Sequence, residues 1–397
     1  MAQSVITTAT TERLLNIESL TRYFPVKVVK GILEETEKVS KRVRDLPAHV
    51  MVYYVIAMTI YMGMPYREVM RQLLGGGSRY LSKCRKKPPV KSSICKARIK
   101  LGWEPFKRLH DQLVKPVATK KTRGAWYRNW LTVGIDGSTV DVPDTEENSK
   151  AFGRSKSVRG KSAFPQIRFV SLLETGTRVL FGTKFAGVSK ASEKKLAKKV
   201  LPSLEPGMLC MADRYYLGYD FLKEALKTGA DILWRASNVF NLKPEKYLQD
   251  GSYLCTIYKS ESDKKNKRNG IQVRVVEYNL QGYRQKYRLV TSILDPKLAP
   301  AEELAALYHE RWEIEISIGE LKTRLRGADI VLRSQKPDLV KQEFLGFLLS
   351  YFAIRGIMHE AALEANEDPD RLSFTHTVRV VKRALPHFVD FSPAAAA

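Results

Sequence analysis

Four polar residues between positions 308 and 322 could bind a phosphate group and a metal ion. Tyr308, Arg311, Glu315 and Lys322 lie in a segment with no proline and one glycine, a pattern that predicts one helix. Because an α-helix advances about 100° per residue, their side chains would share one narrow stripe beside the apolar stripe that packs on the core. A carboxylate among a phenol, a guanidinium and an ammonium group suits a site for phosphate and metal.

The spacing of these four residues resembles the Tyr-Arg-Glu-Lys signature of bacterial DDE transposases of the insertion-sequence-four family. In that family the glutamate is the last member of an Asp-Asp-Glu triad that binds metal. Taken alone, the segment also fits a solvated helix in which an Arg311–Glu315 pair contributes only about 0.3 kcal/mol. The rest of the chain must decide between these interpretations.

Two aspartates on predicted strands could complete the triad. Asp136 lies within a long strand pattern, and Asp213 follows a short apolar strand. Asp136-Gly-Ser resembles the first motif of the family. Asp213-Arg-Tyr-Tyr resembles the second motif, although the family usually has glycine where Tyr215 stands. Asp141 is a rival of Asp136, but it lies an odd number of residues away and would face the opposite side of a regular strand.

The chemistry of these side chains predicts their roles. Three carboxylates would repel one another unless divalent metal neutralises them, and oxygen ligands favour Mg²⁺ or Mn²⁺. Two such ions would activate a nucleophile and stabilise the leaving oxygen of a phosphodiester. We expect Arg311 to hold a phosphate bidentately, with Lys322 as a point charge and Tyr308 bonding a phosphate oxygen. Trp312 could stack on a base, and a flipped base would suit a hairpin intermediate, as the resemblance implies.

The charge of the chain indicates a polyanionic partner. Its 397 residues carry a formal net charge of +25, from 67 Lys and Arg against 42 Asp and Glu. The basic clusters recur along the whole chain, which favours nucleic acid over a membrane-surface anchor. We therefore expect double-stranded DNA as the partner.

Other features of the sequence predict a cytoplasmic, nucleoid-associated bacterial protein. The four cysteines show neither CxxC pairs nor histidines at zinc-ligand spacing, so reduced thiols are expected. The N-terminus lacks the pattern of a secretory signal, and the longest apolar run, at 50–64, is too short to span a membrane.

The order of predicted elements indicates an α/β protein. Residues 1–125 predict an α-helical N-terminal domain that binds DNA, and a basic helix at 92–102 could enter a groove or lie on the surface of the bundle. Three consecutive strands and then strand–helix alternation describe a ribonuclease-H-like sheet. Its strands are predicted at 131–142, 166–173, 178–186, 208–213 and 231–235.

Further strands at 253–258, 271–280 and 287–294 predict a β-rich insertion at about 237–294. An insertion just before the last catalytic residue is what the resemblance implies. The catalytic domain would then span 126–338. Helices in 339–397 would complete it or serve DNA binding or dimerisation.

The resemblance implies cut-and-paste transposition of an insertion sequence. Strands would be cleaved at terminal inverted repeats and transferred into target DNA, with a homodimer in the DNA-bound complex. Two alternatives stay open: a nuclease with the same metal site but no strand transfer, and a domesticated DNA-binding protein without catalysis. The acidic triad beside a basic stripe argues against the second, and analysis of reaction products would separate the first.

Overall fold

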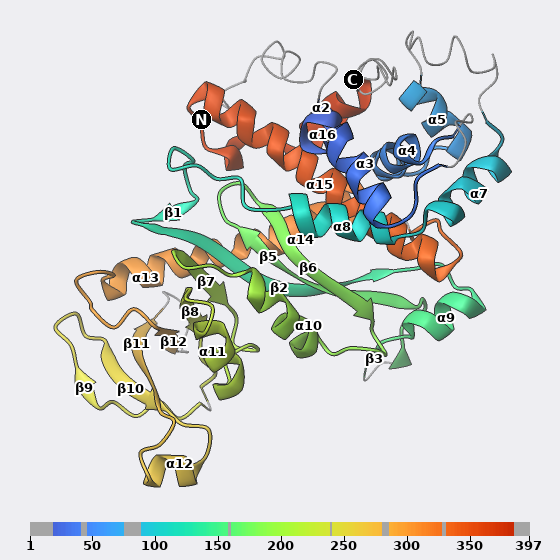
Figure 1. Ribbon diagram of the computed structural model, residues 1–397. Helices are drawn as coiled ribbons and strands as arrows, with labels where there is room; N and C mark the ends of the chain where they lie inside the picture. Colours follow the sequence, from blue (N-terminus) through green and yellow to red (C-terminus); the bar gives the residue numbers. More distant parts are fainter. Residues whose placement is uncertain are drawn as a thin grey trace.

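The computed structural model describes residues 19–40, 46–74, 89–157, 160–238, 240–279, 286–327 and 331–384. Helices come first, a mixed sheet with interspersed helices follows, and helices end the described chain (Figure 1). Within these ranges, no helix is long and apolar enough to cross a membrane. Residues 1–18 and 385–397 of the two predicted terminal domains lie outside the described ranges.

One ten-stranded mixed sheet organises the protein. Its main path runs in the order β6-β5-β2-β7-β8-β12-β11-β10-β9, and β1 pairs with β2 off this path. Strands β6, β5 and β2 are antiparallel neighbours, whereas β7 and β8 continue parallel to β2. The strands are β1 (Trp126–Tyr127), β2 (Trp130–Asp141), β5 (Gln166–Glu174), β6 (Val179–Gly187), β7 (Met208–Ala212), β8 (Asp231–Arg235), β9 (Lys246–Tyr247), β10 (Tyr253–Ile257), β11 (Ile271–Asn279) and β12 (Lys286–Thr291).

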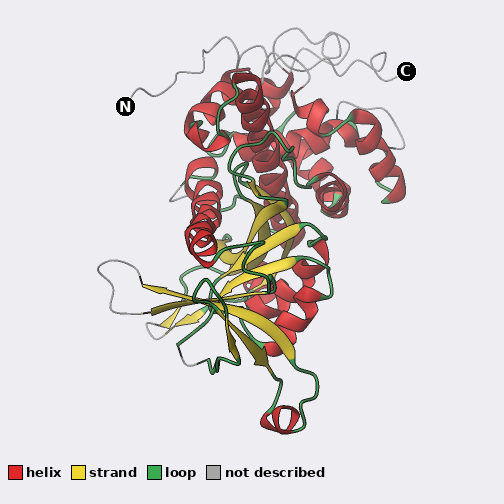
Figure 2. Cartoon of the chain, turned by 90° about the vertical axis from the view of Figure 1, so that its left-hand side faces the viewer, coloured by secondary structure: helices red, strands yellow, loops and turns green. Residues whose placement is uncertain are grey.

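The predicted insertion strands extend this sheet. β12 pairs antiparallel with β8, with Val290 opposite Trp234, and β11, β10 and β9 follow outward. Figures 1 and 2 show these strands at one end of the protein, together with α12 (Glu261–Lys265), and the terminal helices at the other end. Trp234 is fully buried, so it belongs to the core and is not available to stack on DNA.

Helices cover both faces of the sheet. A β-carbon built on Gly137 would lie 2.8 Å from Glu193 of α10 (Glu193–Val200), and one on Gly134 would lie 3.5 Å from Ile314 of α14 (Trp312–Gly319). Because side chains alternate along a strand, α10 and α14 lie on opposite faces. Ser192 begins α10 by accepting a hydrogen bond from the Lys195 amide.

The described part of the chain before β1 forms helices that pack on the long C-terminal helix α15 (Pro337–Ala365). Helix α4 is almost entirely buried against α15, where the Thr59 hydroxyl lies 3.0 Å from that of Ser350. One continuous hydrophobic core includes residues from α4, α15 and the sheet. The domain boundaries at 125 and 338 stay predictions. These helices are α2 (Ser19–Tyr23), α3 (Val26–Glu35), α4 (Ala48–Ile60), α5 (Tyr66–Leu74), α7 (Lys91–Leu101) and α8 (Glu104–Leu113).

The basic helix predicted at 92–102 is α7, and its one arginine, Arg98, anchors it to α15. Arg98 is fully buried; its guanidinium donates to the Gln342 side-chain oxygen at 2.8 Å and to the Ser334 hydroxyl at 2.9 Å. Lys96 and Lys100 remain exposed on the other side. The helix therefore has one face fixed in the core and one basic face open to solvent.

Replacing Arg98 should destabilise the whole protein. We expect Arg98→Ala to lower the free energy of unfolding by about 3 kcal/mol, because it leaves Gln342 without its donor and empties a buried volume. Urea unfolding measures this, with the exposed Lys96→Ala on the same helix changing stability by less than about 0.5 kcal/mol. Equal stability of the two variants would show that Arg98 does not tie α7 to α15.

Candidate active site

The parallel pairing of β2 with β7 brings two of the candidate carboxylates together. Gly134 pairs with Met211 in this register, so two residues further along each chain stand Asp136 and Asp213. Asp136 lies inside the long strand β2, whereas Asp213 directly follows β7. The rival Asp141 instead accepts a hydrogen bond from the Gln166 side chain at 2.7 Å.

Asp136 lies in an electrostatically strained position. Burial raises the pKa of its carboxyl group to about 7, and the negative charges of Asp213 and Glu193 add to this. The Gly137 amide, which donates to Asp136 Oδ1 at 2.7 Å, and the guanidinium of Arg311 act in the opposite direction. The carboxyl of Asp136 is thus affected by charges from both faces of the sheet.

The segment that carries Glu315 is not one regular α-helix, so the prediction of a uniform stripe was wrong. It is divided into α13 (Ala301–Leu307), the 3₁₀ turn η2 (Tyr308–Arg311), α14 and the π-helical η3 (Glu320–Leu325). The cause is packing against the sheet at both ends. The Tyr308 hydroxyl donates to the Ala212 carbonyl at 3.0 Å, and Lys322 Nζ donates to the Ser138 hydroxyl at 3.2 Å. Departures from α-helical winding of this kind often occur at functional sites.

Tyr308 and Lys322 contact β7 and β2, and the four signature residues differ in exposure. Tyr308 is buried, and Arg311 is only 9% exposed. Arg311 donates to Glu315 Oε1 at 2.8 Å, and Glu315 itself is exposed. Trp312 is 56% exposed, with the Arg311 guanidinium 5.3 Å from the centre of its ring.

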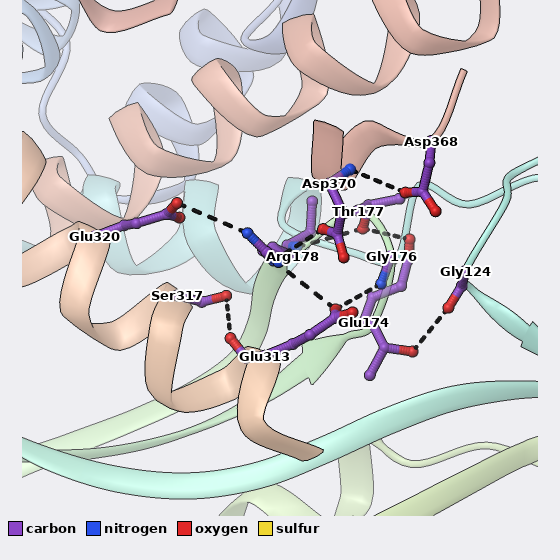
Figure 3. A network of polar contacts seen from close by, with 12 residues as sticks. Gly124, Glu174, Gly176, Thr177, Arg178, Glu313, Ser317, Glu320, Asp368 and Asp370 are labelled. Carbon is purple, nitrogen blue, oxygen red and sulfur yellow. Dashed lines mark hydrogen bonds and ion pairs between the residues drawn. The ribbon is translucent and has the colours of Figure 1, made fainter. Parts of the chain in front are cut away.

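Buried polar and charged side chains fix the opposite side of the segment (Figure 3). Glu313 accepts a hydrogen bond from the Gly176 amide at 2.8 Å, in the turn between β5 and β6. Burial raises the pKa of Glu313 to about 9, and the nearby Asp370 adds to this. Arg178 pairs with Asp370 at 2.9 Å, and Glu320 accepts a hydrogen bond from Arg355 of α15. This network holds α14 and η3 between the sheet and the C-terminal helices.

Sequence reasoning missed Glu193. The hydroxyl of buried Tyr216 donates to the Glu193 carboxylate at 2.9 Å. The Glu193 side chain also covers Gly137, which is next to Asp136. The capping pattern at Ser192 places Glu193 in the first turn of a helix but gives no signal that this turn lies over the strand of Asp136. In the described part of the chain, no three His, Cys, Asp or Glu side chains are already arranged as a metal-ligand set.

Carboxylates on adjacent strands, with basic and aromatic side chains beside them on a strongly basic protein, indicate an enzyme that acts on DNA. The comparison with known families gives the same class. Residues 14–111 match the family described as insertion element 4 transposase N-terminal, and residues 132–353 match the transposase DDE domain. The chain belongs to the insertion-sequence-four family of DDE transposases and is a DNA transposase. Enzymes of this family typically use divalent metal.

A curated relative supports this assignment. The chain is 27% identical over 386 residues to the transposase InsG for insertion sequence element IS4 of Escherichia coli (strain K12). The similarity covers 95% of this chain and 85% of that relative. It therefore includes both matched families and the helices that follow them.

Because Arg311 is buried, its replacement should affect the stability of the protein as well as its activity. We expect Arg311→Ala to stop DNA cleavage and also to lower the free energy of unfolding by about 1–2 kcal/mol, because it removes a buried side chain and the partner of Glu315. Arg311→Lys should restore stability more than activity, since an ammonium group lacks the planar fork.

Single-turnover cleavage and thermal unfolding measure these two effects separately. The exposed Glu310→Ala, in the same turn, is the control and should leave both near the wild-type values. Full activity of Arg311→Ala with only a lowered melting temperature would assign Arg311 a purely structural role.

Proposed function

We propose that this transposase performs metal-dependent cut-and-paste transposition, with Asp136, Asp213 and Glu315 as its catalytic carboxylates. Three antiparallel strands followed by two parallel ones support a ribonuclease-H-like catalytic domain. The observation that carries the proposal is the parallel register of β2 and β7, which brings Asp136 beside Asp213, with Arg311 near enough to influence the Asp136 carboxyl. Three motifs distant in sequence thus meet at one place.

The side chains present fit a divalent cation. Asp136, Asp213 and Glu315 offer only oxygen ligands, which favour Mg²⁺ or Mn²⁺, and two ions suit this family. The raised pKa of Asp136 reflects unfavourable burial and repulsion that a cation would relieve. When bound, the ions would activate the attacking oxygen and stabilise the leaving one.

Glu315 is suited to a change of partner. Its side chain is exposed and is held at 2.8 Å by Arg311, and ion pairs with an exposed carboxylate contribute about 1 kcal/mol or less. A turn of the Glu315 side chain towards Asp136 would therefore cost little. The same movement would release the guanidinium of Arg311 for a phosphate group.

Arg311 and Tyr308 contribute in different ways. Arg311 Nε is buried without a hydrogen-bond partner among the described residues, so it is an available donor for a phosphate oxygen. The Tyr308 hydroxyl already donates to the Ala212 carbonyl, which makes it a positioning group for the strand end that carries Asp213. This differs from the direct phosphate contact expected from the sequence.

The other parts of the proposal concern the DNA. Trp312 is exposed beside Arg311 and is the candidate to stack on a flipped base near the cleaved bond. The net charge of +25 supports binding of terminal inverted repeats and target DNA. A homodimer would hold two transposon ends together, and the cytoplasm, at the nucleoid, is the proposed location.

Cleavage should depend on each of the three carboxylates. We expect Asp136→Ala, Asp213→Ala and Glu315→Gln to abolish Mg²⁺- or Mn²⁺-dependent cutting of a duplex that carries the terminal repeat. Binding of that duplex should persist, because the basic surface supplies most of the affinity. Cleavage assays with and without chelator measure the metal-dependent cutting, and a mobility-shift assay measures the binding of the duplex.

The rival aspartate on the same strand provides the control for the triad. Asp141→Asn should keep cleavage, since Gln166 holds the Asp141 carboxylate and Asp141 lies five residues further along β2 than Asp136. Cutting at the wild-type rate by any of the three triad variants would remove that residue from the site.

Binding to DNA should weaken steeply as salt is added. Each phosphate contact releases condensed counterions, so several contacts predict at least a hundredfold loss of affinity between about 50 and 200 mM salt. Fluorescence anisotropy of a labelled duplex measures this. A flat plot of the logarithm of the affinity against that of the salt concentration would contradict a DNA-binding role for the positive charge.

A further inference from the structure

An exposed aromatic ring lies immediately beside the candidate active site. Tyr215 is 45% exposed, and its backbone amide donates to Asp213 Oδ1 at 2.9 Å. Two residues of chain span at most about 7 Å, so the backbone of Tyr215 lies close to any phosphate held at Asp213.

The neighbouring Tyr216 shows what a structural tyrosine does here. Tyr216 is buried, donates its hydroxyl to Glu193 and packs on Phe221 with ring centres 5.6 Å apart. The Tyr215 ring contacts Tyr216 edge-on, with centres 5.5 Å apart, and leaves one side open. The core therefore explains Tyr216 but does not require an aromatic residue at position 215.

Basic side chains lie beside the open ring, together with the carboxylates of Glu193 and Asp213. Lys194, in the first turn of α10, places its Nζ 4.8 Å from the centre of the Tyr215 ring. Arg214 is exposed next to it in the chain, and α10 presents a row of exposed lysines to solvent, namely Lys194, Lys195, Lys198 and Lys199. An aromatic face among cations is the combination that binds single-stranded or unpaired nucleotides.

We propose that Tyr215 and Lys194 form a second DNA contact, in which the ring stacks on the base of a nucleotide next to the cleaved bond and Lys194 holds an adjacent phosphate. This contact rests on the proposed catalytic role of Asp136 and Asp213. It lies on the side of α10, whereas Trp312 begins α14 on the opposite face of the sheet. The two aromatic side chains would therefore contact different parts of the DNA.

The test places 2-aminopurine, whose fluorescence reports stacking, at each position that flanks the cleaved bond in a duplex of the terminal repeat. Measured in chelator, without cleavage, wild-type protein should change the fluorescence at one flanking position. Tyr215→Ala should remove that change and weaken binding about tenfold, whereas Tyr215→Phe should keep both. Lys194→Ala should weaken binding and reduce its salt dependence.

Tyr247 supplies a matched control, because it is 70% exposed and also contacts a second tyrosine, Tyr253, with ring centres 5.7 Å apart. Tyr247→Ala should leave the fluorescence and the affinity unchanged. An unchanged signal with Tyr215→Ala overturns the contact even when the triad variants are inactive. An active Asp136→Ala variant overturns the catalytic assignment instead, so the two failures are distinguishable.

An abasic nucleotide at the reporting position gives an independent check. If the ring acts by stacking on that base, Tyr215→Ala and the abasic substitution should each lower the binding affinity by the same factor. Combining the two should lower the affinity no further. Additive losses would show that Tyr215 acts elsewhere.

Discussion

Like charge on neighbouring strands is the constraint on which the rest of the site depends. The parallel register of β2 and β7 places Asp136 and Asp213 side by side, and burial raises the pKa of Asp136 to about 7. Such an arrangement is unfavourable unless positive charge is supplied nearby. The guanidinium of Arg311 supplies part of it. A divalent ion would supply the remainder, so the same repulsion that destabilises the unbound site favours metal binding.

Placing Arg311 there requires that an irregular segment be held firmly, and buried polar and charged side chains on its far side do this. Glu313 bonds the turn between β5 and β6, and Glu320 bonds Arg355 of α15. Because α15 also packs on α4, the N-terminal helices share a core with the helix that orients the site. Charges buried in this way need every partner, so loss of one contact would disturb the orientation of Glu315 more than the overall stability suggests.

The local pattern of apolar and polar residues predicted the individual strands of the sheet. The apolar run at 208–212 and the alternation around Asp136 identified β7 and β2, and the order of motifs identified the two aspartates. The burial of Arg311 was not predictable, because it results from winding that departs from 3.6 residues per turn where packing demands it. Glu193 was missed for a related reason, since only the packing of α10 over β2 places its carboxylate beside Asp136. The pairing of β12 with β8 likewise depends on contacts distant in sequence.

The spacing of the signature residues has a mechanical explanation as well as a chemical one. Tyr308 begins the signature segment and hydrogen-bonds the end of β7. Lys322 ends the segment and hydrogen-bonds Ser138 on β2. The segment therefore links the two strands that carry Asp136 and Asp213, and Glu315 lies between the two attachments. A metal site built from two strands and a helix needs all three fixed relative to one another, because carboxylate ligands displaced by even about 0.5 Å lose productive geometry. Residues at the ends of the signature can thus be required for catalysis without touching DNA.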